Sequence, residues 1–396
     1  MRVLAVGNMY PPHHLGGYEL VWRGAVRHLR DRGHQVEVLT TDFRRPAPDE
    51  PEEPGVRRDL RWWWRDHAFP RRSPRARLAQ ERHNHAVLER ALAEGAPQLV
   101  TWWGMGGMSL SLVTAVARAG LPSLAFVHDD WLSYGPVVDQ WTRMFARRRR
   151  LGRLAESRTG IPARFEPEHV ARWLFVSEFT RRRALETGLA LRDTGVAHSG
   201  IAPDYLGPAP ERDWEWRLLY VGRIDERKGA DVAVAALADL PAAATLTIVG
   251  DGDEDHLRAL HEHVAASGLT ARVRLDPGRR REELRAVYDA HDALLFPVRW
   301  DEPWGLVPLE AMARGRPVVA TGTGGSAEYL RDGENALLVP RDDPGALAAA
   351  VRRLAEDPAL RGRLRAAGLP SAAAHTETQF NAAVAAAVES DWRSII

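Results

Sequence analysis

The sequence of 396 residues contains no cysteine, which excludes disulfide bonds, thiolate nucleophiles and thiolate metal sites. It also has no apolar run near the roughly 20 residues needed to cross a bilayer. The first residues lead directly into a strand-like run at 2–7, without the layout of a signal peptide. We therefore expect a cytoplasmic protein.

Lysine is almost absent as well. Of the 54 basic residues only Lys228 is a lysine, and it follows the strand-like run 217–221 within the segment Gly222–Gly229. A lysine is a compact charge on a flexible stem and an arginine is a planar fork, so the two are not interchangeable at a phosphate. A single lysine can fall in a loop by chance, but the glycines, the nearby Arg223 and the helix start that follows favour an anion-binding role.

Charge is unevenly divided along the chain. Residues 1–200 carry 31 basic and 22 acidic residues, and residues 201–396 carry 23 and 31, giving net charges of +9 and −8. This asymmetry predicts two domains with different partners. The basic residues are spread out and match no recognition motif, so we expect no nucleic-acid partner. A basic first half suits peripheral contact with a membrane, and the oligomeric state stays open.

Short apolar runs alternate with longer amphipathic segments, which is typical of parallel sheets covered by helices. The strands are expected at 2–7, 35–41, 98–103, 123–128, 172–177, 194–198, 217–222, 244–249, 272–275, 293–298, 317–321 and 336–339. The helices are expected at 17–32, 76–94, 107–119, 138–155, 178–187, 229–238, 254–267, 281–289, 305–314, 325–331 and 344–355. This predicts an α/β fold with two Rossmann-like, doubly wound domains, residues 1–200 and 201–376. The tail, 377–396, reads as a helix that packs back on the first domain.

Residues 44–75 are irregular, rich in proline, glutamate and arginine, and include Trp62, Trp63 and Trp64. Three adjacent tryptophans point to both faces of any strand, so we expect at least one near the surface or a cleft. A hairpin with one buried face is slightly favoured. The alternative is an acceptor platform or a membrane-facing patch.

Several glycine-containing loops follow strands, where ligands bind in open parallel sheets. Gly16 and Gly17 stand at a helix start, where backbone N–H groups can approach a phosphate. Arg223 and Lys228 place two cations on one loop, which suits a diphosphate. Gly250 and Gly252 end the next strand in a sharp turn that suits a flat base, or is simply a turn between strand and helix.

The strongest signal is the segment 296–315, in which a loop holds Glu302 and a helix begins near Gly305 and Leu306. Glu310 then lies about one turn into that helix. Two carboxylates near a helix N-terminus can accept hydrogen bonds from the hydroxyls of a sugar and a ribose. A single acidic residue at a helix start is common, but that does not explain both glutamates with the Pro-Trp-Gly loop and the following strand.

Residues 217–340 resemble the donor domain of the retaining glycosyltransferases of family 4, which have the GT-B fold. The matching pieces are Gly222-Arg223…Lys228-Gly229, Gly250-Asp251-Gly252, Glu302 with seven residues before Glu310, Leu309–Gly315, Pro317–Thr321 and Gly324–Glu328. The first half fits through Gly16-Gly17, His128 at a strand end and Ser177-Glu178. The resemblance implies that the two domains face each other across a cleft.

The resemblance also implies roles. Arg223 and Lys228 would hold the donor diphosphate and neutralise it as it leaves, and Gly222, Gly250 and Gly252 would be among the donor-binding residues. Glu310 would take the ribose, and Glu302 would take the transferred sugar with backbone N–H groups near Gly305 and Leu306. Gly16 and Gly17 would close over the phosphates, and His128 would touch the sugar or the acceptor. Such families need no metal or other cofactor, and the first half has no Asp-x-Asp motif at a strand end.

The acceptor is the least determined partner. Its candidate contacts are Asp129 and Asp130, or Trp102 and Trp103; the acidic pair equally suits a capped helix start. Where the family often has Asn-Gly-Val/Ile-Asp, this chain has Ser199-Gly200-Ile201-Ala202, which leaves sugar recognition or hinge geometry open. A lipid-linked glycan, a polysaccharide intermediate and a secondary-metabolite aglycone all remain candidates.

Three rival functions deserve comparison. A sugar-nucleotide epimerase shares the architecture but calls for a carboxylate and histidine set that the sequence does not place as well. A nicotinamide dehydrogenase is disfavoured because Gly-x-Gly-x-x-Gly follows neither first strand. A non-catalytic nucleotide-binding or membrane-docking protein would use the basic patches at 62–72 and 147–150, the second of which suits a solvated helix face.

Overall fold

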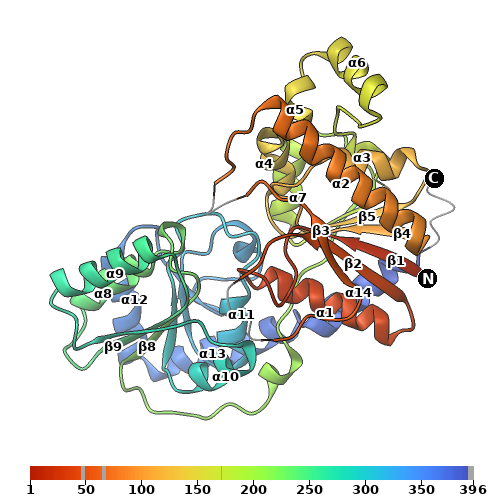
Figure 1. Cartoon of the computed structure of the whole chain (residues 1–396). Coiled ribbons are helices and arrows are strands. Elements are labelled where there is room, and N and C mark those ends of the chain that lie inside the picture. Colours follow the sequence, from red (N-terminus) through yellow and green to blue (C-terminus); the bar gives the residue numbers. More distant parts are fainter. Residues whose placement is uncertain (46–49, 65–67, 171, 391–396) are drawn as a thin grey trace. The chain divides into compact units, whose positions relative to one another are not determined.

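The computed structural model describes residues 1–45, 50–64, 68–170 and 172–390 (Figure 1). The chain forms two compact units. Unit 1 comprises Met1–His198 and the C-terminal stretch from Phe380, and unit 2 comprises Ser199–Gln379. The expected fold class, two parallel-sheet Rossmann-like α/β domains, is confirmed. The assignment of acceptor and donor domains to 1–200 and 201–376 stays a prediction.

Unit 1 contains a sheet with the strand order β3-β2-β1-β4-β5-β6-β7, and every pairing is parallel. Its strands are β1 Arg2–Val6, β2 Gln35–Thr41, β3 Val56–Leu60, β4 Leu99–Trp102, β5 Ser123–Val127, β6 Arg172–Phe175 and β7 Thr194–Val196. Its helices are α1 Tyr18–Asp31, α2 Pro74–Gly95, α3 Ser111–Arg118, α4 Trp131–Val138, α5 Thr142–Phe145, α6 Arg149–Thr159, α7 Glu178–Glu186 and most of α14 Glu377–Val388.

Unit 2 has a second parallel sheet, with the strand order β10-β9-β8-β11-β12-β13. Its strands are β8 Arg217–Val221, β9 Thr245–Val249, β10 Val273–Asp276, β11 Ala293–Phe296, β12 Val318–Ala320 and β13 Leu337–Leu338. Its helices are α8 Ala230–Ala238, α9 Glu254–Ala266, α10 Arg281–Asp289, α11 Leu306–Ala313, α12 Pro344–Glu356 and α13 Pro358–Ala373. Short 3₁₀ turns connect them at Glu226–Lys228 and Gly324–Glu328.

The central strands are buried along their whole length because helices cover both faces of each sheet. All four residues of β11 are buried, as are all five of β5 and all four of β4. The carboxyl ends of β8 and β11 lie side by side, since these two strands pair directly. The loops that carry Lys228 and Glu302 follow those two ends and are therefore brought together.

The helix expected at 138–155 is wrong, because the segment breaks into α4, α5 and α6. Asp139 causes the first break. Its backbone is extended, and its carboxylate accepts hydrogen bonds from the N–H groups of Trp141 and Thr142, starting a new turn there.

The hairpin expected around Trp62 is also wrong. The strand before it, β3, pairs with β2 in parallel, and residues 61–64 continue past its end as a loop. Trp62 and Trp63 are buried and Trp64 is half-buried, with the rings of Trp62 and Trp64 stacked at 4.7 Å. Residues 65–67 of the same irregular segment lie outside the described residues.

Candidate functional site

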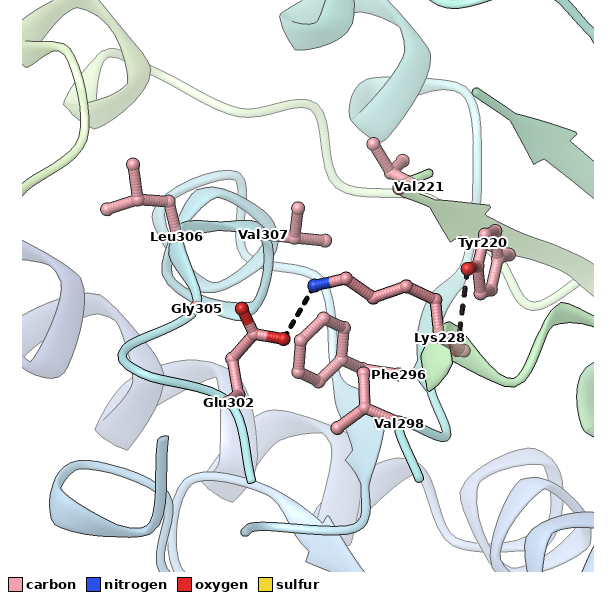
Figure 2. Close-up of a pocket in the computed structure, with 10 residues that line it drawn as sticks. Tyr220, Val221, Lys228, Phe296, Val298, Glu302, Gly305, Leu306 and Val307 are labelled. Atoms are coloured by element: carbon pink, nitrogen blue, oxygen red, sulfur yellow. Dashed lines mark hydrogen bonds and ion pairs between the residues drawn. The ribbon is translucent and has the colours of Figure 1, made fainter. Parts of the chain in front are cut away.

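The largest concentration of predicted site residues lines a cavity of about 70 Å³ in unit 2 (Figure 2). Its walls come from the ends of β8 and β11 and the start of α11: Tyr220, Val221, Gly222, Lys228, Phe296, Val298, Glu302, Gly305, Leu306 and Val307. Five of the predicted residues, Gly222, Lys228, Glu302, Gly305 and Leu306, therefore meet in one place.

Lys228 and Glu302 form an ion pair across this cavity (Figure 2). Lys228 Nζ lies 2.6 Å from Glu302 Oε2, and the two side chains are 16% and 11% exposed. Trp300 completes the group, because its Nε1 donates to the same carboxylate oxygen at 2.9 Å and its ring lies 5.3 Å from the ammonium. Sequence reasoning missed Trp300, although its position two residues before Glu302 was a usable signal.

Arg223 is placed differently from Lys228. Its guanidinium pairs with Asp225 at 2.7 Å, and Asp225 also accepts from the backbone N–H of Arg227. Arg223 does not line the cavity wall that Lys228 forms. Its side chain is about one-third exposed, so it remains accessible to a ligand from solvent.

The start of α11 points backbone donors at the cavity. Gly305 has a φ of 87°, which a side chain would strain, and this turn directs the chain into the helix at Leu306. The first N–H groups of a helix have no partner within the helix, so Leu306 and Val307 can offer theirs to an anion. Pro308 lies in the first turn, where a missing N–H costs nothing.

Glu310 lies deeper than Glu302 and does not line the cavity. It is buried, and Tyr288 Oη donates to its Oε2 at 2.8 Å. Burial raises the pKa of Glu310, while the nearby Arg281 and the Tyr288 hydrogen bond oppose that rise. Tyr288 and Arg281 come from α10, and no sequence motif connected them to this glutamate.

The glycines after β8 and β9 serve close packing between two loops. A Cβ on Gly250 would lie 1.8 Å from the carbonyl oxygen of Gly222, and one on Gly252 would lie 2.5 Å from that of Ile224. Asp251 accepts a hydrogen bond from the N–H of Gly278. These glycines are therefore needed for the loops to touch, and contact with a base stays a prediction.

In unit 1, the glycine pair stands at the start of α1. The N–H of Gly16 donates to Glu19 Oε2 at 3.1 Å, and Gly17 is the N-cap residue. A Cβ on Gly17 would meet nothing within 4 Å, so space is open on that side. Glu19 is buried and was missed as a partner of the pair, although a glutamate in the first turn of a helix is a recognisable signal.

His128 follows β5, and its ring packs between those of Tyr18 and Phe380, 4.7 and 5.3 Å away. Neither ring nitrogen has a hydrogen-bond partner, and burial lowers the pKa of His128 to about 3. This histidine is therefore neutral near pH 7.

The two aspartates after His128 have separate partners. Asp129 accepts from Tyr134 Oη at 2.9 Å and from the N–H of Trp131, and burial raises its pKa to about 6. Asp130 pairs with Arg183 at 3.1 Å. The contact with Trp131 is made at the first residue of α4, whose N-cap residue Asp130 makes no capping hydrogen bond, so the helix-start and acceptor interpretations both stay predictions.

Trp102 and Trp103 are at most 1% exposed. Trp102 belongs to the main core of unit 1, and Trp103 stacks on Trp22 and Phe126. Both side chains are buried because a parallel sheet covered on both faces packs against helices, and contact with an acceptor stays a prediction.

The segment that departs from the family pattern, Ser199–Ala202, is packed within unit 2. The carbonyl of Ser199 accepts from Trp304 Nε1 at 2.8 Å, and the N–H of Ile201 donates to the carbonyl of His375. A Cβ on Gly200 would overlap the backbone of Thr376. The segment Ser199–Ala202 therefore contacts the loop after Glu302, through the hydrogen bond from Trp304.

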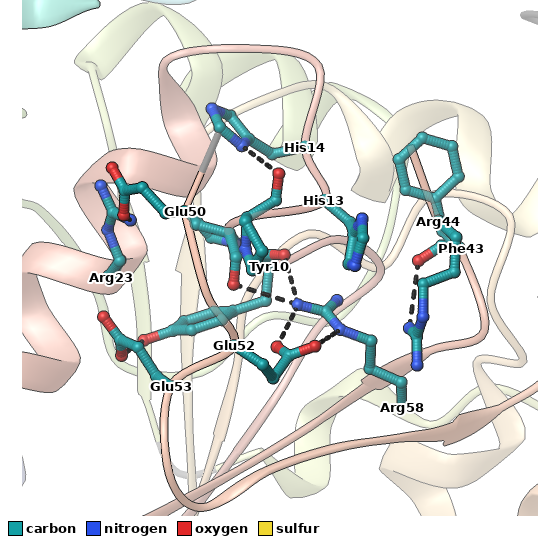
Figure 3. A network of polar contacts seen from close by, with 12 residues as sticks. Tyr10, His13, His14, Arg23, Phe43, Arg44, Glu50, Glu52, Glu53 and Arg58 are labelled. Atoms are coloured by element: carbon teal, nitrogen blue, oxygen red, sulfur yellow. Dashed lines mark hydrogen bonds and ion pairs between the residues drawn. The ribbon is translucent and has the colours of Figure 1, made fainter. Parts of the chain in front are cut away.

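A polar network in unit 1 ties the loop after β1 to the segment before β3 (Figure 3). Arg58 donates to the carbonyls of Tyr10 and Pro11 and forms a bidentate pair with Glu52. The N–H of Arg45 donates to His13 Nδ1. Residues 46–49 lie outside the described part of the chain. The network holds the backbone that leads to Gly16. The sequence did not predict these contacts.

Two findings concern metals and membranes. Within the described residues, no group of three or more histidine, aspartate and glutamate side chains is arranged to hold a metal ion. None of the helices described is both long and apolar enough to span a bilayer.

The chain matches two family models in sequence. Residues 15–205 match the model described as Glycosyltransferase Family 4, and residues 215–357 match Glycosyl transferases group 1. A D-inositol 3-phosphate glycosyltransferase of Streptomyces bingchenggensis is 34% identical over 210 residues, covering 50% of this chain and 43% of that protein. A phosphatidyl-myo-inositol mannosyltransferase of Mycobacterium leprae is 36% identical over 206 residues, 49% of this chain and 52% of that protein. The chain thus spans about half the length of these curated relatives.

Solved structures of similar fold cover nearly the whole chain. Anabaena HepE in complex with UDP and glucose has a TM-score of 0.72 and 20% identity, covering 99% of this chain and 100% of that one. Sucrose-phosphate synthase from Thermosynechococcus elongatus has a TM-score of 0.73 and 23% identity, covering 99% and 98%. At such identities the likeness establishes the fold.

Proposed function

This chain belongs to glycosyltransferase family 4, the glycosyl transferases group 1, and we propose that it moves a sugar from a nucleoside-diphosphate sugar to an acceptor hydroxyl with retention of anomeric configuration. The observation that carries the proposal is the cavity of unit 2, where Lys228, Glu302 and the start of α11 converge. A compact cation, a carboxylate and free backbone donors match a diphosphate joined to a sugar.

The donor diphosphate takes the place that the Lys228 ammonium and the N–H groups of Leu306 and Val307 define. Lys228 neutralises the leaving phosphate, and Arg223, which is accessible from solvent, adds a second cation by turning from Asp225. Because these groups supply the positive charge, the transfer needs no metal ion.

Glu302 binds hydroxyls of the transferred sugar, and Glu310 binds the ribose. Glu302 is suited to the sugar because it lines the cavity and is held by Trp300 and Lys228. The ribose hydroxyls would have to reach a carboxylate of Glu310 that is buried beside Tyr288. The roles of Gly16, Gly17 and His128 in unit 1 stay predictions.

The reaction depends on positioning and charge stabilisation more than on covalent help from the protein. The leaving phosphate takes the proton of the incoming acceptor hydroxyl on the same face of the sugar. The oxygen of that hydroxyl forms the new glycosidic bond as the bond to the phosphate breaks, and Lys228 holds the phosphate's negative charge. Removing this cation should slow transfer by about 10²–10³-fold.

For the acceptor, the names of the relatives add two candidates to test first. Inositol phosphate and phosphatidylinositol hydroxyls join the glycan, polysaccharide and aglycone candidates, because the proteins that carry those names share this chain's family. UDP is the first nucleotide to test, since HepE was solved with it.

The test is a thermal-shift screen of the full chain against UDP, GDP, ADP and TDP and their sugars, followed by an assay for release of the diphosphate with each acceptor class. We expect one base to stabilise the protein, and Lys228→Met to abolish that shift while leaving the unliganded fold intact. A screen in which no nucleotide stabilises the protein would refute the donor site.

A further inference from the structure

A short helix of unit 1 carries apolar side chains on its outward face. In α6, Leu151 is 50% exposed and Leu154 is 44% exposed. Only a handful of large apolar side chains in the described residues are exposed, and two of them are on this one helix. Figure 1 shows α6 at the outer end of unit 1, away from the sheet.

The opposite face of α6 already has its own packing partner. Gly152 is buried there, and a Cβ on it would lie 3.2 Å from Phe145 and 3.5 Å from Ala163. These two residues form a small apolar cluster with Trp141 and Ile161. Leu151 and Leu154 are therefore not needed to hold the helix in place, and their exposure calls for another reason.

The same segment is strongly basic. Residues 142–159 contain seven arginines and a single acidic residue, Glu156, giving a net charge of +6. Glu156 faces inward, where it accepts from the N–H of Ala163 and lies 3.6 Å from Arg118. The run Arg147–Arg150 is exposed, and no carboxylate of the described residues pairs with it.

Helical spacing places these two features on one surface. Leu151 and Leu154 are three residues apart and share a face, and Arg150 and Arg158, each four residues from Leu154, lie at the two ends of that face. An apolar ridge between cations is the arrangement of helices that lie in a membrane interface. In such helices apolar side chains enter the acyl boundary, while long arginine side chains reach the headgroups.

We propose that the outward face of α6, with Arg147–Arg150, docks unit 1 onto an anionic lipid surface. A second copy of the chain is a poor fit, because two such faces would bring a charge of +6 against another of +6. Nucleic acid would match the arginines but leave the exposed leucines without a purpose. Anionic lipid satisfies both, and the inference does not rest on the proposed transfer reaction.

The experiment is vesicle flotation of the full chain, with neutral phosphatidylcholine vesicles and vesicles that carry about 30% anionic lipid. We expect binding to the anionic vesicles alone, weakened by raising the salt from about 0.1 to 0.5 M. Two variants separate the contributions: Leu151→Asn with Leu154→Asn keeps every charge, and the fourfold Arg147–Arg150→Gln keeps the leucines. Each should lower the vesicle-bound fraction at least tenfold.

The matched controls lie in the same unit. Leu185→Asn changes an exposed leucine of α7, and Arg82→Gln with Arg90→Gln changes exposed arginines of α2; both should bind as the parent does. Since all altered side chains are exposed, thermal unfolding should be unchanged in every variant. Equal binding of the leucine variant and the parent, equal binding to neutral vesicles, or absence of any binding would overturn the proposal. So would self-association that the leucine variant abolishes in sedimentation without lipid.

Discussion

Glu302 and the donor diphosphate should compete for one cation, which makes Glu302→Gln an informative change. In the structure Lys228 Nζ lies 2.6 Å from the Glu302 carboxylate, so a bound phosphate has to share an ammonium that is already paired. Glutamine removes the negative charge but keeps an amide oxygen that can accept from Trp300 Nε1. We therefore expect Glu302→Gln to bind free nucleoside diphosphate more tightly and to transfer sugar more slowly.

The size of the effect follows from the charge that the variant loses. Glutamine still accepts a hydrogen bond from the ammonium but removes the attraction between two opposite charges, which is about 1 kcal/mol at the upper end of measured ion pairs and becomes available to the phosphate. This corresponds to about fivefold in Kd. Lys228→Met should move the affinity in the opposite direction, because it removes the cation itself.

Titration calorimetry at fixed salt, with the nucleotide that the thermal screen selects, measures both changes. Glu334→Gln, an exposed glutamate of unit 2, serves as the matched control for removing one negative charge. If Glu302→Gln left the affinity for the diphosphate unchanged or weakened it, the idea that the carboxylate holds the lysine away from the phosphate would fail. Slower transfer with tighter diphosphate binding is the result that supports it.

Further predictions concern packing and pH. Gly250→Ala should destabilise unit 2 by about 1–3 kcal/mol in thermal unfolding, because its Cβ would overlap the Gly222 carbonyl; an unchanged melting temperature would contradict this. Gly17→Ala has open space and should melt as the parent does, yet transfer more slowly if the N–H groups there meet a phosphate. Glu81 is buried in α2, where Ser111 Oγ donates to its carboxylate at 3.0 Å. Burial and the nearby Asp139 raise its pKa to about 8 from 4.5, so its contribution to stability is full below pH 4.5 and is lost as the pH rises through 8. The free energy of unfolding in urea should therefore depend less on pH between 4.5 and 8 for Glu81→Gln than for the parent. The same pH dependence in both proteins would refute the raised pKa of Glu81.

The sequence predicts the strands well because buried parallel strands are continuous apolar runs, as in Leu294–Phe296 and Val318–Ala320. It does not predict β3, because that strand is not a continuous apolar run. The strand Val56–Leu60 lies at the sheet edge and reads Val-Arg-Arg-Asp-Leu, so neither composition nor alternation distinguishes it from the polar segment around it.

In the candidate site, the residues that could be predicted are those whose position along the chain sets their position in space. Lys228 and Glu302 follow the ends of β8 and β11, two strands that pair, and the topology alone brings them together. The roles of Trp300 and Tyr288 were not predicted, because their contacts with Glu302 and Glu310 depend on side-chain direction. The burial of Trp102 and Trp103 was not predicted, because an aromatic at a strand end is buried or exposed according to the helix that covers it.

Unit 1 is built from both ends of the chain, and this has a consequence for its synthesis. Phe380 packs on Phe126 and His128, and Glu389 forms a bidentate pair with Arg32. At about 5–20 residues per second, about 10–40 s separate the emergence of His198 from that of Phe380. During this interval the ribosome-bound chain exposes the apolar surface that Phe380 later covers, while unit 2, which is continuous, can complete itself. Docking of α14 should therefore be the step that closes unit 1, and a nascent chain stalled before residue 380 is expected to recruit chaperones through that surface.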